Sequence, residues 1–171
     1  MSEKKILIAY FSRNGENYVS GKIVDLPLGN TKIIAQMIQE INGGELFEIK
    51  SSVPYPKDYT ETTEVAKNEL KSNLRPTLIN HIEDISLYNI VFLGFPNWWN
   101  TMPMPVFTFL DEYNFSGKVI IPFCTHEGSG MGRSEKDIAK VCPTAIVEKG
   151  IAIHGTNVKN SMDAVRNLVL R

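Results

Sequence analysis

The sequence has little of what marks several protein classes. Its two cysteines, Cys124 and Cys142, form no C-x-x-C pair and accompany no histidine cluster. We therefore predict two buried thiols rather than a disulfide framework or a zinc site, and expect no bound metal. The 18 Lys and Arg residues nearly match the 19 Asp and Glu residues. This balance offers no basic excess, so nucleic acid is not predicted as a partner.

Long apolar runs are also missing. None approaches the roughly 18 residues that a membrane span requires, and the N-terminal MSEKKILIAYFSR passes from charged residues into a strand-like segment without a cleavage site. We therefore expect a soluble, cytoplasmic protein without a membrane span. The chain has 171 residues, of which 43% are hydrophobic. That length suits one substantial core, and we predict a single domain over residues 1–171.

What is present is an alternation of short apolar runs and helix-like segments. Strands are predicted at 5–11, 45–49, 90–95, 118–124 and 145–153, the last interrupted near Glu148. Helices are predicted at 31–42, 58–74, 105–113 and 133–141, and through a final stripe of Val158, Met162, Val165 and Val169. Nearly continuous apolar strands that alternate with helices predict an α/β fold with a parallel sheet covered by helices on both faces.

The loop after the first strand combines hydroxyl groups with a helix start. In open parallel sheets, ligands bind beyond the carboxyl ends of the strands, so the loops after those ends are where function is sought. Here Ser12 to Gly15 is followed by an insertion, 16–29, and by Asn30 and Thr31 at the start of a helix. Free backbone N–H groups and the helix dipole at such a place suit a phosphate. The alternative is that Asn30 or Thr31 only caps the helix and Gly15 only makes a turn.

The loop after the strand at 90–95 reads PNWWNTMP and holds the only two tryptophans, Trp98 and Trp99. Successive residues of an extended chain face opposite ways, so both side chains cannot point into one core. We expect at least one of them to face the cleft, where an indole plane would stack on an aromatic ligand. The alternative is that both fill apolar gaps or a subunit interface.

The loop after the strand at 118–124 reads THEGSGMG and is rich in glycine. Glycines allow the backbone and its N–H groups to approach a planar polar ring closely. One loop suited to phosphate, one to an aromatic face and one to polar ring edges together match the parts of flavin mononucleotide (FMN). A P-loop nucleotide hydrolase is disfavoured because no Gly-Lys-Ser/Thr follows the first strand.

Three segments resemble the FMN-binding loops of flavodoxin-like proteins: YFSRNG with GNTKIIA, GFPNWWNTMPMPVFTFL, and CTHEGSGMG. The resemblance is closest to a short bacterial group whose middle loop reads Pro-x-Trp-Trp, and it implies a five-stranded sheet of order 2-1-3-4-5. It implies non-covalent FMN, with phosphate contacts from Ser12, Asn14, Asn30 and Thr31. It further implies isoalloxazine contacts from Pro96, Asn97, Trp98, Trp99, Asn100 and Thr101, and contacts at the pyrimidine end from His126, Glu127, Gly128 and Ser129.

The sequence departs from that family in its first loop. The segment ENYVSGKIVDLPLG separates Gly15 from Asn30, so Gly15 and Gly29 compete for the glycine position of the phosphate loop. An insertion of this length costs little loop-closure entropy, so the site can survive it. The same segment is a candidate lid over the flavin.

The near-neutral charge bears on how the flavin is used. Flavodoxin-type electron carriers are usually strongly acidic so that they dock on basic redox proteins, which this chain is not. We therefore favour an oxidoreductase that passes electrons from a reductant such as NAD(P)H to a small, quinone-like acceptor. A carrier between redox proteins and a non-catalytic binding module are the alternatives. No residue is assigned a catalytic role.

An apolar group near the predicted cleft leaves two interpretations open. Trp98, Trp99, Met102 and Met104 form either a homodimer surface or part of an acceptor pocket. Tyr55 and Tyr59 follow the second strand, where packing of their rings is the simpler interpretation and a place in the acceptor pocket is the alternative.

Overall fold

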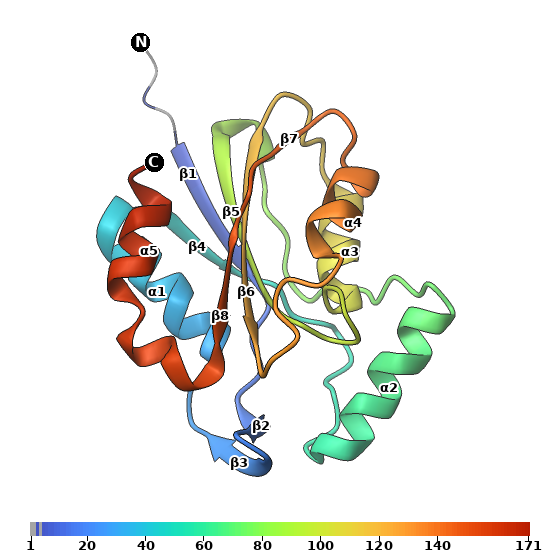
Figure 1. Ribbon diagram of the computed structural model, residues 1–171. Helices are drawn as coiled ribbons and strands as arrows, with labels where there is room; N and C mark the ends of the chain where they lie inside the picture. The colour runs from blue at the N-terminus through green and yellow to red at the C-terminus, as the bar shows by residue number, and fades with distance from the viewer. Residues whose placement is uncertain (1–2, 4) are drawn as a thin grey trace.

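Nearly all of the chain forms one parallel sheet with helices around it (Figure 1). The computed structural model describes residue 3 and residues 5–171. The strands of the sheet are β1 (Lys5–Tyr10), β4 (Glu45–Glu48), β5 (Tyr88–Pro96), β6 (Val119–His126), β7 (Ile146–Val147) and β8 (Ile151–His154). Their spatial order is β4-β1-β5-β6-β7, with β8 also beside β6, and every pairing is parallel. Counted along the chain, this is the predicted order 2-1-3-4-5, with the fifth strand interrupted near Glu148 as predicted.

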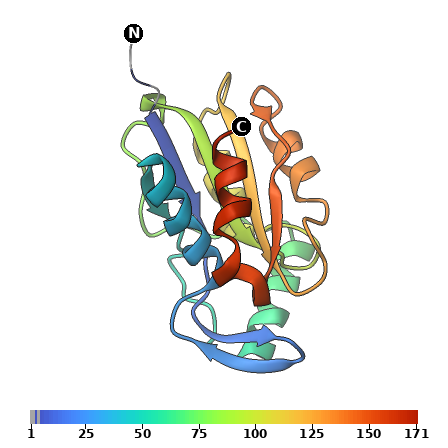
Figure 2. The same cartoon turned by 60° about the vertical axis from the view of Figure 1, so that its left-hand side comes forward.

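Helices cover both faces of the sheet, which confirms the predicted fold class. On one face lie α1 (Asn30–Asn42) and α5 (Met162–Val169), and on the other lie α3 (Met104–Glu112) and α4 (Ser134–Val141) (Figures 1 and 2). Short 3-10 helices span Ile85–Leu87 and Gly155–Asn160. The final apolar stripe is thus divided between two elements, since Val158 lies in a 3-10 helix and α5 begins only at Met162.

The core consists of two apolar layers, one on each face. Alternate residues of β1 supply them: Leu7 and Ala9 belong to the layer under α3 and α4, whereas Ile8 and Tyr10 belong to the layer under α1 and α5. Burial of one such Leu or Ile side chain contributes about 1.5–3 kcal/mol. The two cysteines lie in the first layer as free thiols, where burial raises the pKa of Cys124 to about 12 and that of Cys142 to about 11.

Two elements lie outside this layered body. The insertion forms a β-hairpin of β2 (Gly15–Val19) and β3 (Lys22–Leu26), which sequence reasoning did not predict. Its turn residues Ser20 and Gly21 both have positive φ, 48° and 85°, which is typical of tight hairpin turns. Helix α2 (Tyr59–Lys71) lies with the hairpin at the end of the sheet where the strands finish (Figure 1).

The described residues include no helix that is both long enough and apolar enough to cross a bilayer.

Candidate functional site

The two ends of the hairpin insertion meet at the start of α1. A Cβ atom on Gly29 would clash with Ser12 Oγ and would lie only 2.6 Å from the carbonyl oxygen of Arg13, so no larger residue fits there without a shift of the backbone. Gly15 instead has φ of 81° and opens the hairpin. Gly29, and not Gly15, is therefore the glycine at which the chain packs closely against Ser12 and Arg13. The inserted hairpin does not separate Ser12 from the start of α1.

The first turn of α1 offers donors for an anion. Gly29 is the N-cap residue and has no side chain, while Ser12 Oγ accepts a hydrogen bond from Lys32 N–H at 3.1 Å. Neither Asn30 nor Thr31 is the N-cap residue, and neither backbone N–H has a hydrogen-bond partner among the described residues. Thr31 Oγ1 lies 2.8 Å from Thr125 Oγ1, which ties α1 to the end of β6. Two free N–H groups at the positive end of the helix dipole favour an anionic ligand.

A cavity of about 330 Å³, here called the central cavity, lies beside this turn and is bordered by all three predicted loops. The predicted site residues that border it are Asn30, Thr31, Pro96, Asn97, Trp98, His126, Glu127 and Ser129. The remaining lining comes from β6, the hairpin, the first loop and the start of α2: Thr125, Asn17, Tyr18, Arg13 and Tyr59.

The other predicted residues lie elsewhere. Ser12 and Asn14 border two neighbouring cavities, and Trp99 borders a cavity of about 290 Å³ next to α2. Thr101 is fully buried and its hydroxyl donates to Asp137 Oδ2 at 2.5 Å, while the carbonyl oxygen of Asn100 accepts from Arg133 N–H.

Gly128 donates its N–H to His126 Nδ1 at 2.9 Å. Asn100, Thr101 and Gly128 therefore shape the loops, and none of them borders a cavity described for this rim. Which of the predicted residues contact a ligand stays a prediction.

The side chains of the two tryptophans point in different directions because Trp98 begins a tight turn and Trp99 lies inside it. Trp98 N–H and the carbonyl oxygen of Thr101 are hydrogen bonded at 2.9 Å, and the two central residues, Trp99 and Asn100, have φ of 55° and 72°. A bulky side chain in this left-handed region is rare and carries strain. Trp98 turns inward to the central cavity, whereas Trp99 is 45% exposed and its Nε1–H donates to Thr63 O of α2 at 3.0 Å.

Met102 and Met104 are buried in the core. Neither residue therefore contributes to an exposed apolar surface, and the apolar group predicted from the sequence reduces to the two tryptophans.

Acceptor groups gather in the third loop. Glu127 Oε2 accepts a weak hydrogen bond from Ser20 N–H of the hairpin at 3.3 Å and lies 3.8 Å from His154 Nε2. Glu127 Oε1 is buried and has no hydrogen-bond partner among the described residues. The His126 and His154 rings pack edge to face at 5.5 Å. Burial, and then the neighbouring His154, lower the pKa of His126, so the neutral imidazole is favoured.

Sequence reasoning did not assign a role at the cavity to Asn17 or Tyr18 of the hairpin. Tyr18 stacks on Tyr59 of α2 with ring centroids 6.2 Å apart, and Glu16 Oε2 accepts from Tyr59 N–H at 2.6 Å. The hairpin thus bridges α2 and the third loop across the central cavity. The dipeptide Ser20-Gly21 between β-branched and aromatic residues is the sequence signal of this hairpin.

Comparisons with known proteins agree with this architecture. A candidate flavoprotein from Bacteroides uniformis ATCC 8492 has 26% identity and a TM-score of 0.78, over 99% of this chain and 100% of that chain. Another, from Bacteroides eggerthii DSM 20697, has 27% identity and a TM-score of 0.71, over 95% and 98%. A flavoprotein from Lactobacillus acidophilus NCFM, crystallised in complex with FMN, has 24% identity and a TM-score of 0.66, over 92% and 97%.

No protein of curated function matches the sequence. A family profile described as flavodoxin matches residues 5–169, which is nearly the whole chain. With that match, and with the sheet order and rim loops described above, the chain belongs to the flavodoxin family.

Proposed function

We propose that the chain binds FMN non-covalently in the central cavity and passes electrons from a reductant such as NAD(P)H to a small, quinone-like acceptor. The observation that carries the proposal is the meeting, at one cavity, of a helix N-terminus with free N–H groups and the indole of Trp98. The similar flavoprotein of Lactobacillus acidophilus NCFM was crystallised with FMN, which supports the choice of ligand.

The phosphate end of FMN suits the start of α1. The N–H groups of Asn30 and Thr31 supply donors, and the helix dipole favours the negative charge. Lys32, the cationic residue of this turn, lies 3.9 Å from the Glu48 carboxylate, so its charge is already partly engaged. The loop would therefore hold phosphate mainly through neutral donors, as the sequence predicts.

The ring and its sugar-alcohol chain suit the rest of the cavity. Trp98 supplies an apolar plane, and Asn97 and Ser129 supply polar groups beside it. Glu127 Oε1 is buried and lacks a hydrogen-bond donor among the described residues. The ribityl hydroxyl groups and the ring N–H of FMN are donors that would satisfy it. When bound, FMN supplies the capacity to accept and release one or two electrons. The protein residues orient the ring, and the stacked rings of Tyr18 and Tyr59 border the cavity on one side.

The direct test is the colour of the purified protein and its affinity for FMN. We expect flavin absorbance, release of the chromophore by heat, and no adenylate in the released material. Trp98→Ala is expected to weaken FMN binding by about tenfold, because stacking contributes about 0.5–1.5 kcal/mol beyond burial. Trp99→Ala serves as the matched control, with a smaller effect. A colourless protein that does not take up FMN would favour the binding-module alternative.

A second candidate, the electron carrier between redox proteins, is favoured by membership of the flavodoxin family. Steady-state oxidation of NAD(P)H with a panel of quinones separates the two. Turnover with a quinone supports the oxidoreductase. No turnover with any acceptor, together with fast electron exchange with a redox protein, supports the carrier.

A further inference from the structure

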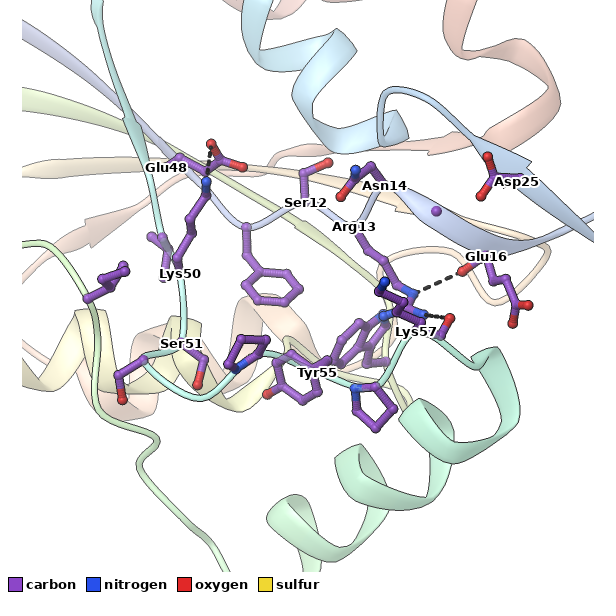
Figure 3. Close-up of a pocket in the computed structure, with 18 residues that line it drawn as sticks. Ser12, Arg13, Asn14, Glu16, Asp25, Glu48, Lys50, Ser51, Tyr55 and Lys57 are labelled. Atoms are coloured by element: carbon purple, nitrogen blue, oxygen red, sulfur yellow. Dashed lines mark hydrogen bonds and ion pairs between the residues drawn. The ribbon is translucent and has the colours of Figure 1, made fainter.

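A larger cavity lies next to the central cavity, on the β4 side of the first loop. It has a volume of about 710 Å³ and is called the side cavity here (Figure 3). Its walls come from the first loop, the base of the hairpin, the end of β4 and the segment 50–57. Cavities of about 300–1,000 Å³ are typical of small-molecule sites. Arg13 and Trp98 border both cavities, so a molecule in the side cavity would be a near neighbour of one in the central cavity.

One wall of the side cavity is an aromatic cluster of Phe11, Tyr55 and Trp98. The rings pack edge to face in every pair, with centroids 5.9 Å apart for Phe11 and Tyr55, 5.2 Å for Phe11 and Trp98, and 5.1 Å for Tyr55 and Trp98. The Tyr55 hydroxyl donates to Glu69 Oε2 at 2.6 Å. Burial raises the pKa values of Tyr55 and of Glu69, so the phenol stays neutral. Such a wall favours a flat, apolar ring.

The side cavity is also lined by cations, among them Arg13 and Lys57. The Glu16 and Asp58 carboxylates act on Arg13 through space. The Arg13 guanidinium donates to two main-chain carbonyl oxygens, those of Glu16 at 2.9 Å and Lys57 at 3.0 Å, and to no carboxylate of the described residues (Figure 3). Burial lowers the pKa of Arg13 from a value so high that the group stays charged. The Lys57 side chain, close by, forms no ion pair within the described chain.

The carboxylates of the lining differ in how they are engaged. Glu48 Oε2 lies 3.5 Å from Lys50 Nζ, and Glu16 Oε2 accepts from Tyr59 N–H. Asp25 lies on the exposed strand β3. The lining carries as many carboxylates as cations, but neither Arg13 nor Lys57 forms an ion pair with a carboxylate of the described chain, so both cations can pair with a negatively charged substituent on the ligand.

The lining does not suit a dinucleotide. Among the described residues that form it, Gly15 is the single glycine, and no helix N-terminus is included, since α2 begins at Tyr59. A diphosphate usually needs a glycine-rich loop at a helix start. The chemistry of the side cavity instead fits one or two fused rings with an acidic group.

We propose that the side cavity binds the electron acceptor, and that this acceptor is an aromatic quinone with a carboxylate or sulfonate substituent. The redox part of this inference rests on the proposed function. Reduction of the quinone to the hydroquinone consumes two electrons and two protons. Fully reduced, neutral FMN (FMNH2) bound in the central cavity would supply both on returning to its oxidised form, so the reaction would balance. Arg13 and Trp98 stand between donor and acceptor.

The first experiment uses the protein without FMN, so that it does not depend on the cofactor. Binding of 1,4-naphthoquinone-2-sulfonate is measured by quenching of tryptophan fluorescence, beside neutral 1,4-naphthoquinone. We expect the sulfonate to bind more tightly than the neutral quinone. Lys57→Glu is expected to weaken sulfonate binding by about tenfold, and to leave the neutral quinone within about twofold, because exposed charge pairs contribute up to about 1 kcal/mol and reversal adds repulsion.

The matched control is Lys71→Glu, the same charge change on α2 outside the side cavity. Equal weakening of both quinones, equal effects of both variants, or no binding of the sulfonate would each overturn the proposal.

A second experiment uses the FMN-loaded protein. The chemically reduced protein is mixed with the sulfonated quinone, and re-oxidation of the flavin is followed by absorbance. Lys57→Glu is expected to raise the quinone concentration for half-maximal rate about tenfold, with unchanged FMN affinity. Competition between quinone and FMN for binding would place both in one cavity and overturn the inference. If FMN fails to bind while the charge-dependent quinone binding persists, the proposed function fails and the side cavity remains a ligand site.

Discussion

Helices α1 and α2 follow the neighbouring strands β1 and β4, yet the protein holds them in different ways. Helix α1 buries Thr31, Ile34, Ala35 and Ile38 against the sheet, whereas α2 buries only Thr62 and Ala66. Contacts around the rim hold α2 instead: the hydrogen bond from Tyr59 N–H to Glu16, the bond from Trp99 to Thr63, and the Lys67 ammonium 5.4 Å from the Trp99 ring centre.

The difference separates what stabilises the fold from what shapes the candidate site. The apolar stripe of α1 belongs to the core, so changes there affect the whole molecule. Helix α2 packs Leu70 against the core and is otherwise held at the cavities by polar and aromatic contacts, so changes to these contacts should act locally.

The largest effect is expected when one apolar side chain is truncated on each helix and the losses of stability are compared. Ile38→Ala removes a fully buried side chain of α1 and is expected to lower the free energy of unfolding by about 2–5 kcal/mol. Val65→Ala, at a 37% exposed position of α2, is expected to change it by no more than about 0.5 kcal/mol. Urea denaturation measures both. Similar losses for the two variants would show that α2 is as much a part of the core as α1.

The start of α1 is the next place to test, because there the core helix meets the site. Gly29→Ala puts a methyl group against Ser12 Oγ and the Arg13 carbonyl, and is expected to cost about 1–3 kcal/mol of stability. It should also weaken FMN binding at least about tenfold, since the free N–H groups move. Pro27→Ala, at an exposed position just after β3, is the control for both measurements. Unchanged FMN affinity in Gly29→Ala would show that the first turn of α1 does not bind the ligand.

Removing the Trp99 contacts should loosen α2 alone. Trp99→Ala is expected to lower the free energy of unfolding by about 1 kcal/mol or less, the net value of one hydrogen bond. Amide hydrogen exchange is expected to quicken in α2 and to stay unchanged in α1. Trp99→Phe keeps a ring near Lys67 but lacks the N–H donor, so it isolates the hydrogen bond. Unchanged exchange in α2 in both variants would mean that other contacts hold this helix.

The smallest expected effect concerns pH at the rim. Because burial and His154 lower the pKa of His126 below its unfolded value of about 6.5, the unfolded chain binds this proton more tightly. The contribution of His126 to stability therefore falls as pH drops through about 6.5, and is constant at higher pH. His126→Gln removes it, so the difference in unfolding free energy between the two proteins should change between pH 7.5 and 5.5. A difference independent of pH would contradict the lowered pKa.

The sequence predicted the layered part of the protein well, because burial leaves a clear pattern. The near-continuous apolar run at 90–95 corresponds to the central strand β5, and the stripe at 31–42 corresponds to α1. The hairpin was not predicted because β3 is mostly exposed and shows no alternation of apolar residues toward a core. Helix α2 was predicted at 58–74, but its place at the rim was not, since periodicity shows which face is apolar and not what lies against it.

The candidate site was predictable where strand ends determine position. The alternation of strands and helices brings Thr31, Trp98 and Ser129 to one cavity. Tyr18 and Tyr59 could not be placed there, because their meeting depends on how the hairpin and α2 pack together. Thr101 resembles the other polar residues of its loop in sequence, yet its hydroxyl is used internally by Asp137.

The close approach of Gly29 to Ser12 and Arg13 brings the two chain ends of the hairpin to one place on the folded body. Chain that departs and returns at one point can be trimmed to a short connection, or replaced by a foreign segment, without displacing β1 or α1. Residues 15–28 therefore offer a grafting position through which new recognition elements can be set directly over the rim.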